Sequence, residues 1–482
     1  MADRSRSTLL IASLATLATF LDTTILYVAF PDITATFTGT STSALSWVLN
    51  AYTIVFAALL IPAGKLADRV GHRRVFLAGS IVFTVASMAC GFAPSAELLI
   101  AFRIIQAGGA AALIPASLAL VMHAFTNDQL PRAVAIWGAA GAVAGALGPT
   151  LGAAIVEGLG WRWAFFINLP VGVYTVLAGR KGLQESSDPT AQIPSPVGVV
   201  LIAAAAGLLS YSVVGSDEFG WLSTRTVGVA LAGCAVLVAF VLHQQRTRAP
   251  ALDLELFRLA NFRWANLATV AFGTAFSAMF FGSILFLTDV WGWSVLQAGF
   301  GVAPGPTTVG LLSPRIGKLA GRIGQRPLLI IGGILFAGSA LYRLAFLDTT
   351  ADYWLEYFPS MVLSGLGVAC VFPQLSSAAA QALPPGRAGV GGAVVQAVRQ
   401  FSGTFGVAIT VAILGASGAA PLGTYDRIWW LIAAGGIATS ILVLPMATRH
   451  PSVDRVEAAG GPAVRTGPRS RTRRGRAGAA RR

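Results

Sequence analysis

The stretch GKLADRVGHRR at Gly64–Arg74 decides the architecture of this chain, because a near copy, GKLAGRIGQRP, stands at Gly317–Pro327. The two copies match at seven of eleven positions, and each follows the second long apolar segment of its half. Parallel repeats of six spans are an established plan for polytopic membrane proteins. The repeat therefore predicts two similar halves of six helices each.

The composition around these two copies indicates a membrane location. The chain has 482 residues, of which 55% are hydrophobic and 11% are charged, whereas about 25% of residues are charged in an average soluble domain. Apolar segments of about 20 residues, which suffice to cross a bilayer as a helix, recur from end to end. We predict an all-α polytopic membrane protein with fourteen spans, at residues 8–30, 46–65, 74–93, 96–124, 131–157, 162–180, 194–214, 225–244, 264–289, 296–318, 327–347, 355–380, 389–416 and 427–447.

The positions of the repeat divide these spans into regions. Spans one to six and nine to fourteen form the two halves, so that spans seven and eight are an inserted pair. The predicted regions are an amino-terminal six-helix bundle (1–185), the inserted helix pair with its linker (186–250), a carboxy-terminal six-helix bundle (251–448) and a basic, disordered cytoplasmic tail (449–482).

The distribution of basic residues predicts the orientation in the membrane. With both termini in the cytoplasm, the inner loops and tails contain 28 of the 34 Lys and Arg residues, and the outer loops contain three. Cytoplasmic loops of membrane proteins carry such an excess of positive charge. The strong preference for Arg over Lys and the many Ala and Gly residues suggest a high-GC bacterium, so we expect a multi-pass protein of a bacterial inner membrane.

The sequence lacks the residue patterns that nucleic-acid binding, catalysis and metal binding require. The net charge of +14 follows membrane topology and is not a basic face for nucleic acid. No nucleophile and base pair, phosphate-binding loop or metal-ligand spacing occurs, so we expect neither an enzyme nor a bound cofactor or metal. The cysteines and histidines are scattered singly: Cys90, Cys234, Cys370, His72, His123, His243 and His450.

Five motifs resemble those of the major facilitator superfamily, and specifically its fourteen-span drug:proton antiporter branch. The resemblance covers all fourteen predicted spans. It implies a carrier that exports drugs or antibiotics by alternating access, driven by the proton gradient. Tyr27, Ala107, Ala144 and Ala153 depart from the branch pattern. The motifs are FLDTTILYVAFPDI (Phe20–Ile33), GKLADRVGHRR (Gly64–Arg74), RIIQAGGAA (Arg103–Ala111), GALGPTLGA (Gly145–Ala153) and WRWAFFINLP (Trp161–Pro170).

Two charged residues inside predicted spans are candidates for proton coupling. Asp22 is the acidic residue that lies well inside a span, and an ionised group there is costly unless it has a function or a partner. We predict that Asp22 binds the proton; the alternative is a structural carboxylate bonded to Thr23, Thr24 or another helix. The resemblance implies a coupling role for Arg103, whose alternative is to cap backbone carbonyl groups.

The loop between spans two and three is a candidate conformational latch, and the alternative is a basic loop that only signals topology. A glycine permits the tight turn, while the charges can pair with a neighbouring helix end in one state and release it in the other. The repeated loop has Gly321 in place of the aspartate, so the acidic contact is available to the amino-terminal copy. The latch residues are Gly64, Asp68, Arg69, Gly71, Arg73 and Arg74.

Span five and two further helices supply the remaining candidates. The small residues Gly145, Gly148, Pro149 and Gly152 allow a close helix crossing and a bend, which the resemblance identifies as the antiporter motif. We also predict substrate contacts from Tyr52, Gln396 and Arg399.

Three functions follow from this reading. We expect a proton-coupled exporter of small organic molecules; a facilitator-type importer of a nutrient would not need the span-five motif, and a membrane receptor or assembly factor with the same fold is a further alternative. The expected partners are a small-molecule substrate, protons and membrane lipids, and the expected state is a monomer. The identity and charge of the substrate stay open.

Overall fold

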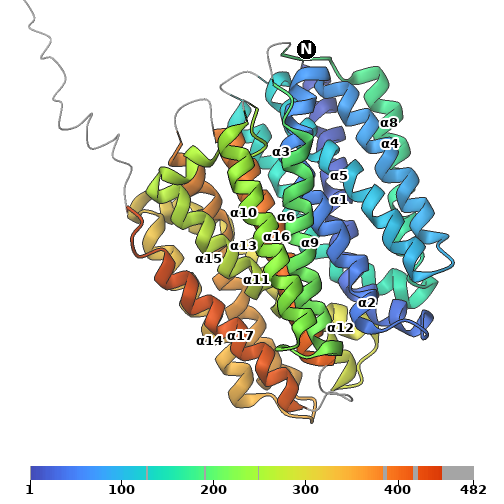
Figure 1. Ribbon diagram of the computed structural model, residues 1–482, viewed down its shortest axis with the longest axis vertical. Coiled ribbons are helices and arrows are strands. Elements are labelled where there is room, and N and C mark those ends of the chain that lie inside the picture. Colours follow the sequence, from blue (N-terminus) through green and yellow to red (C-terminus); the bar gives the residue numbers. More distant parts are fainter. Residues whose placement is uncertain are drawn as a thin grey trace, which may run out of the picture. The chain divides into compact units, whose positions relative to one another are not determined.

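The computed structural model describes residues 2–125, 129–188, 192–247, 249–383, 388–415 and 422–447, and these residues are organised as helices and short connections (Figure 1). Helices before the inserted pair are α1 (Ala2–Thr36), α2 (Thr42–Leu45), α3 (Trp47–Val70), α4 (His72–Gly91), α5 (Ala96–Ala124), α6 (Leu130–Leu159), α7 (Trp163–Phe166) and α8 (Asn168–Gly182). The inserted pair is α9 (Pro196–Phe219) and α10 (Thr224–Arg246). The remaining helices are η1 (Leu254–Arg258), α11 (Ala260–Asp289), α12 (Val295–Val302), α13 (Pro304–Ile323), α14 (Gln325–Phe346), η2 (Tyr353–Tyr357), α15 (Phe358–Gln381), α16 (Ala388–Gly415) and α17 (Leu422–Leu442).

Each predicted span coincides with one helix or with a pair of consecutive helices. Among the described residues, ten helices are long and apolar enough to cross a membrane, and α6, which bends by 47° between Ile136–Gly145 and Leu147–Leu159, would be an eleventh. The all-α polytopic class is therefore confirmed, while the count of fourteen spans stays a prediction. The tail from residue 449 onward lies outside the described residues.

Prolines explain why two predicted spans are divided. Proline has no backbone N–H and disturbs the helical hydrogen-bond ladder, but it is well tolerated in the first turn of a helix. α13 begins at Pro304, directly after Ala303 ends α12. Pro170 lies at the third residue of α8, and Ile167 separates that helix from α7. The interruptions thus follow the positions of Pro170 and Pro304.

The same helix pairings occur in both halves of the chain. In the first half α6 packs on α1, α3 and α4 pack on α5, and α8 packs on α4. Counting six spans from the start of each half, the corresponding pairs in the second half are α11 with α16, α13 and α14 with α15, and α14 with α17. This agrees with the loop repeat, although the boundaries of the four predicted regions stay a prediction.

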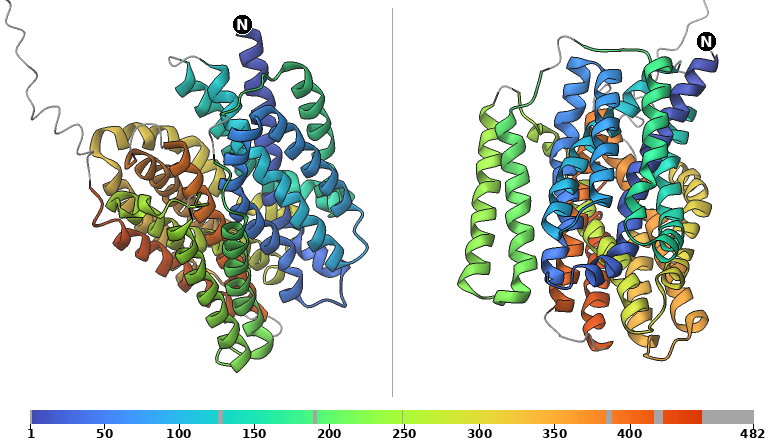
Figure 2. Two further views of the ribbon diagram at one scale, coloured as in Figure 1. Left: turned by 45° about the horizontal axis from the view of Figure 1, so that its top comes forward. Right: turned by 90° about the vertical axis from the view of Figure 1, so that its right-hand side faces the viewer.

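The two halves meet along several helices. α3 packs on α16, α6 packs on α12 and α13, and α9 bridges α3 and α16, whereas α10 packs chiefly on α9. The right-hand view of Figure 2 shows α9 and α10 together at one edge of the helices. Rings of α1 also contact α11, with centroids 5.6 Å apart for Tyr27 and Phe280 and 5.1 Å apart for Phe30 and Phe281.

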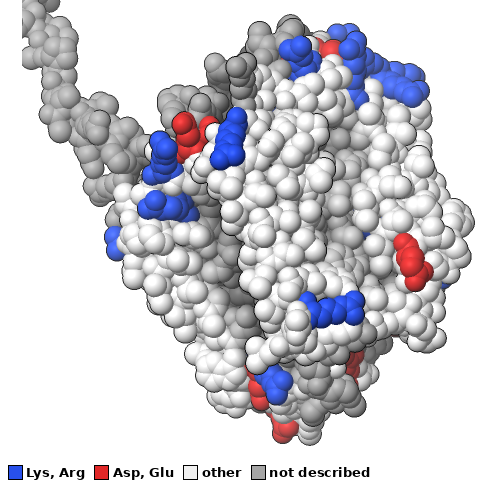
Figure 3. Space-filling view, in the orientation of Figure 1, with Lys and Arg blue, Asp and Glu red and all other residues white. Residues whose placement is uncertain are grey.

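An ion–dipole contact joins the halves at the end of α6 that is predicted to face outward. The Glu157 carboxylate accepts hydrogen bonds of 2.8 Å from the Ser294 hydroxyl and from the Leu296 backbone N–H. A carboxylate at the N-terminus of a helix, here α12, is stabilised by the helix dipole. On the face drawn in Figure 3, Lys and Arg lie mostly toward the end where the N-terminus lies, and the middle is poor in charge. The side of the membrane on which that end lies stays a prediction.

Candidate functional site

α1 and α5 bring the two predicted coupling residues together. Asp22 and Arg103 are each 1% exposed, and an Arg103 Nη1–H donates to Asp22 Oδ2 over 2.5 Å. Among the residues that the structure describes, this is the ion pair in which both side chains are fully buried. Both residues stand out in the sequence, and the structure explains why two charges are tolerated in an apolar interior, because each charge compensates the other.

Two amide side chains complete the environment of the carboxylate. Asp22 Oδ1 accepts hydrogen bonds from Gln106 Nε2 (2.8 Å) and from Asn168 Nδ2 (2.9 Å). The Thr23 hydroxyl bonds to a carbonyl group of α1, and the Thr24 hydroxyl bonds to carbonyl groups of α1 and to that of Ala144 in α6. The alternative of a structural carboxylate bonded to another helix fits these contacts as well as a proton-binding role does, so the role of Asp22 stays a prediction. Asp22 is held by residues from other helices.

The guanidinium group of Arg103 is held on several sides. Its Nε–H donates to the carbonyl oxygen of Val48 (3.1 Å) and its Nη1–H donates to Gln106 Oε1 (2.7 Å). The hydrogen bond to the Val48 carbonyl oxygen is the contact expected if Arg103 caps backbone carbonyl groups, and it is present together with the ion pair. Tyr52 lies beneath the guanidinium carbon, which is 3.8 Å from the ring centroid. Because Tyr52 is 1% exposed, it contacts the ion pair in this conformation, and its role as a substrate contact stays a prediction.

The network continues from Asn168 into α4 and α7. Asn168 Nδ2 also donates to the Ser87 hydroxyl (3.0 Å), which in turn donates to the carbonyl oxygen of Phe165 (2.9 Å). Cys90 lies at the edge of the network, with its sulfur 3.7 Å from Gln106 Oε1. Besides α1, residues of α3, α4, α5, α7 and α8 therefore take part in the network around this carboxylate.

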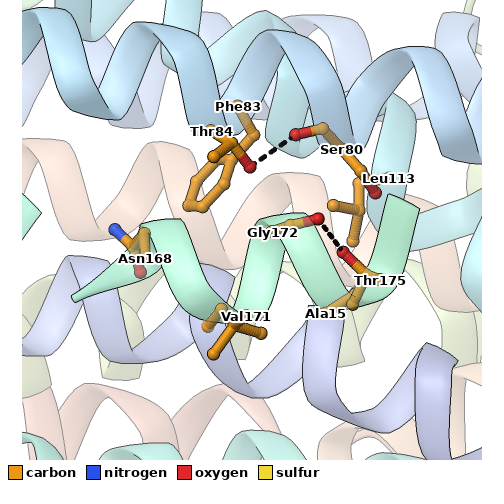
Figure 4. A pocket seen from close by; sticks show the side chains of 10 residues that line it. Ala15, Ser80, Phe83, Thr84, Leu113, Asn168, Val171, Gly172 and Thr175 are labelled. Carbon is orange, nitrogen blue, oxygen red and sulfur yellow. Dashed lines mark hydrogen bonds between the residues drawn. The ribbon is translucent and has the colours of Figure 1, made fainter. Parts of the chain in front are cut away.

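A small cavity of about 10 Å³ adjoins this network on the side of Asn168 (Figure 4). That volume is near the minimum that holds one water molecule. Its wall includes the hydroxyl-bearing residues Ser80, Thr84 and Thr175. The Ser80 hydroxyl oxygen is buried and accepts or donates no hydrogen bond to the described residues, although the Ser80 carbonyl accepts from Thr84. The cavity thus places a polar group without a partner near the residue that bonds to Asp22.

The span-five motif lies between α1 and the second half of the chain. Gly148 faces Thr24 and Gly152 faces Ile25 so closely that a Cβ on Gly148 would overlap the Thr24 hydroxyl. On another side of α6, a Cβ on Gly299 of α12 would lie 2.6 Å from the Pro149 carbonyl oxygen. Gly145 has open space around it. The predicted close crossing is therefore present at Gly148 and Gly152.

The α3–α4 hairpin makes charged contacts within the first half and also with the linker after α10, where Lys65 Nζ donates to the carbonyl oxygen of Pro250 over 2.8 Å. Gly71 has φ = 122°, a region that favours glycine, and Asp68 bonds to His72 Nε2 over 3.0 Å. The carboxylate of Glu185, which follows α8, accepts from the backbone N–H groups of Arg73 (3.0 Å) and Arg74 (3.2 Å).

The latch residue Gly64 has a neighbour outside the hairpin. A Cβ on Gly64 would lie 3.3 Å from the Pro115 side chain of α5, so α3 approaches α5 closely there. Arg69 also has an interaction partner in the structure. The role of the latch residues in switching stays a prediction.

The last predicted residues lie on α16. Gln396 and Arg399 are one turn apart and both are partly exposed. The guanidinium carbon of Arg399 is 5.3 Å from the centroid of the Phe372 ring.

Gln106 and Asn168 were not predicted as site residues, although both lie in motifs that resemble those of the family. The spacing of Arg103 and Gln106, i and i+3 on one helix, was a usable signal, because such residues share a face. Nothing local marks Asn168, which reaches Asp22 only through the packing of α8 against α1 and α4.

Two like halves of apolar helices with a buried, charged network among them are typical of secondary membrane transporters. More particularly, the chain belongs to the Major Facilitator Superfamily, whose profile matches residues 12–407 and 267–473. The resemblance stated from the motifs is thereby confirmed.

Relatives in this family include named exporters. The chain is 34% identical over 417 residues to the multidrug resistance protein Stp of Mycobacterium tuberculosis, covering 85% of this chain and 76% of the relative. It is 31% identical over 405 residues to the multidrug export protein EmrB of Escherichia coli, covering 83% and 78%. It is 33% identical over 412 residues to the cephamycin export protein CmcT of Amycolatopsis lactamdurans, covering 84% of each chain.

Solved structures share the fold. A crystal structure of a D-xylose-proton symporter superimposes with a TM-score of 0.66 at 13% identity, covering 91% of this chain and 97% of that one. A crystal structure of a peptide transporter in complex with sulfate gives a TM-score of 0.65 at 16% identity, covering 91% and 93%.

Proposed function

We propose that this protein exports small organic molecules, drugs or antibiotics among them, in exchange for protons and by alternating access. The observation that carries the proposal is the buried Asp22–Arg103 pair in a chain whose relatives are named drug and antibiotic exporters. A carboxylate held at mid-depth is the group that can take up and release a proton during a transport cycle.

Protonation of Asp22 would supply the coupling step. The proton neutralises the partner of Arg103 and leaves a buried guanidinium without a counter-ion, which is strongly unfavourable. A conformation that offers Arg103 water or another acceptor is then favoured over the present one. The free-energy difference between conformations thus depends on the charge of Asp22.

A chain of packed residues connects this step to the contact between the halves. Thr24 and Ile25 follow Asp22 on α1 and touch Gly148 and Gly152 of α6. The next face of α6 touches Gly299 of α12 in the other half. A shift of α1 relative to Arg103 would therefore displace the span-five motif and the inter-half contact together.

The remaining expectations belong to the same proposal. We place the protein in a bacterial inner membrane with both termini in the cytoplasm, as a monomer that needs no cofactor and catalyses no covalent reaction. Nucleic acid is not an expected partner. Facilitator-type import is less favoured, because the relatives above are named for export and resistance.

Accumulation assays test direction and energy source together. A pump-deficient bacterial host expressing the chain is screened for resistance to a panel of antibiotics, and the accumulation of each hit is measured with and without a proton uncoupler. The proposal predicts lower accumulation than in the empty host and loss of the difference with the uncoupler. Higher accumulation in the expressing host, or a difference that the uncoupler leaves unchanged, would contradict it.

A further inference from the structure

The interior of the described helices contains more positive than negative charge. Arg103, Arg343 and Arg399 lie within helices α5, α14 and α16, whereas Asp22 is the one fully buried carboxylate among the described residues. Since Asp22 is paired with Arg103, two guanidinium groups have no carboxylate partner in this part of the structure.

Arg343 is satisfied by neutral groups. Its Nε–H donates to the Ser360 hydroxyl (3.0 Å) and its Nη1–H donates to the Ser283 hydroxyl (2.7 Å). Its guanidinium carbon also lies 5.0 Å from the ring centroid of Tyr357 and 4.7 Å from that of Trp429. Because Arg343 is 1% exposed, no room is left for a ligand, and we assign it to the packing of the second half.

Arg399 differs from Arg343 both in its exposure and in its hydrogen bonds. It is partly exposed, and its guanidinium group makes no hydrogen bond or ion pair with any residue that the structure describes. The guanidinium carbon instead makes a cation–π contact with Phe372, whose ring centroid is 5.3 Å away. A single cation–π contact offsets only part of the cost of holding a cation at mid-depth in a membrane, so such a residue is a functional candidate.

Gln396 supplies a second donor without a partner on the same face of α16. Its Nε2 is buried and has no hydrogen-bond partner among the described residues, and residues at i and i+3 of a helix are neighbours. A guanidinium group offers only donors, and an amide nitrogen adds two more. The ligand that satisfies this set is an acceptor with negative charge, such as a carboxylate.

Aromatic rings extend from Arg399 toward α1. The ring centroids of Phe372 and Phe276 are 5.2 Å apart, those of Phe276 and Phe280 are 6.1 Å apart, and Phe280 contacts Tyr27 at 5.6 Å. Phe372, Phe276 and Tyr27 are partly exposed. A flat aromatic body could therefore lie against these rings while its charged end meets Arg399.

We propose that the exported molecules are aromatic organic anions and that Arg399, assisted by Gln396, binds the anionic group. This inference rests on the proposed export function and names its substrate class. Tyr27 lies at the far end of the rings and five residues after Asp22 on α1, so a bound anion would lie near the helix that carries the proton site.

Binding to the purified full-length protein tests the charge preference without any proton gradient. The probes are 2-naphthoate, 2-naphthamide and (2-naphthyl)trimethylammonium, which share one aromatic body and differ in charge. Binding is measured by the shift in thermal unfolding, followed by intrinsic tryptophan fluorescence. We expect naphthoate to bind roughly tenfold or more tightly than the other two, as a hydrogen-bonded charge requires.

Variants then assign the preference to Arg399. Arg399→Gln should weaken naphthoate binding by roughly 10- to 100-fold and leave the amide unaffected, while Arg399→Lys should keep part of the preference. Arg343→Gln removes another interior cation of the same half and should leave the ratio of naphthoate to ammonium binding unchanged. Equal binding of the three probes, a preference for the cation, or a preference that survives Arg399→Gln would overturn the inference. Because no gradient is applied, these results are independent of whether export is driven by protons.

Discussion

Replacing Asp22 with asparagine should destabilise the protein, by an amount that its contacts allow to be estimated. The substitution keeps the shape of the side chain but removes the charge that compensates Arg103, its partner at 2.5 Å. If the NH₂ group of the asparagine took the place of Oδ2, it would face the Nη1–H donor of Arg103, and no hydrogen bond could form between them. Breaking one member of a buried ion pair costs about 3–5 kcal/mol, because the other charge is left uncompensated.

The double variant Asp22→Asn/Arg103→Gln separates this effect from a general loss of packing. Removing both charges eliminates the uncompensated cation, and replacing a whole buried ion pair is often neutral or stabilising. We therefore expect the double variant to recover most of the stability that Asp22→Asn loses, although both should lack proton-driven transport. Of these three proteins, Asp22→Asn should be the least stable, and the wild type and the double variant should both be more stable than it.

Thermal unfolding of the purified proteins in one detergent, at one protein concentration, measures this order. Arg103→Gln alone completes the double-mutant cycle, and the non-additive part reports the coupling between the two residues. If Asp22→Asn lost less than about 1 kcal/mol, or if the double variant were less stable than both single variants, the buried ion pair would not hold these helices as described.

Three further predictions concern the motifs outside the pair. Gly148→Ala should slow transport, because its Cβ would overlap the Thr24 hydroxyl, whereas the matched variant Gly145→Ala meets no atom within 4 Å and should transport normally; equal rates would refute the close-crossing role. Asp68→Asn should shift the conformational equilibrium by about 1–3 kcal/mol toward the inward-open state. Single cysteines, placed in a background without native cysteines, should then be labelled more from the cytoplasmic side, and Gly321→Asp should not reverse this increase. Unchanged labelling would leave this loop as a topology signal. Deletion from Val456 onward should leave transport largely intact, because every motif precedes it, and an inserted but inactive truncation would contradict this.

Charged residues in apolar helices are visible in a sequence, and this explains what could be predicted. Asp22 and Arg103 stand out because their desolvation cost demands a partner or a function, and the structure brings them together. Helix positions followed from apolar length alone, and the loop repeat indicated the pairing of helices in both halves. Local pattern therefore carried the class of fold and the centre of the site.

Neutral polar residues carry no such signal. Gln106 and Asn168 could stand in an apolar helix as satisfied side chains, and only the packing of three helices shows that both bond to Asp22. Tyr52 could be named from its position on α3, but its place beneath Arg103 depends on how α3 crosses α5. These contacts are set by tertiary structure.

Coupling of proton movement to drug movement through Asp22 can be measured in membrane vesicles. Everted membrane vesicles from cells expressing the protein are energised to form an inward pH gradient, which a fluorescent amine reports by quenching, and a drug identified by the resistance screen is then added. The account predicts that the drug partly reverses the quenching with the wild-type protein, because protons leave as the drug enters, and has no effect with Asp22→Asn at equal abundance. Equal reversal by the Asp22→Asn protein would contradict the assignment of the coupled proton to this carboxylate.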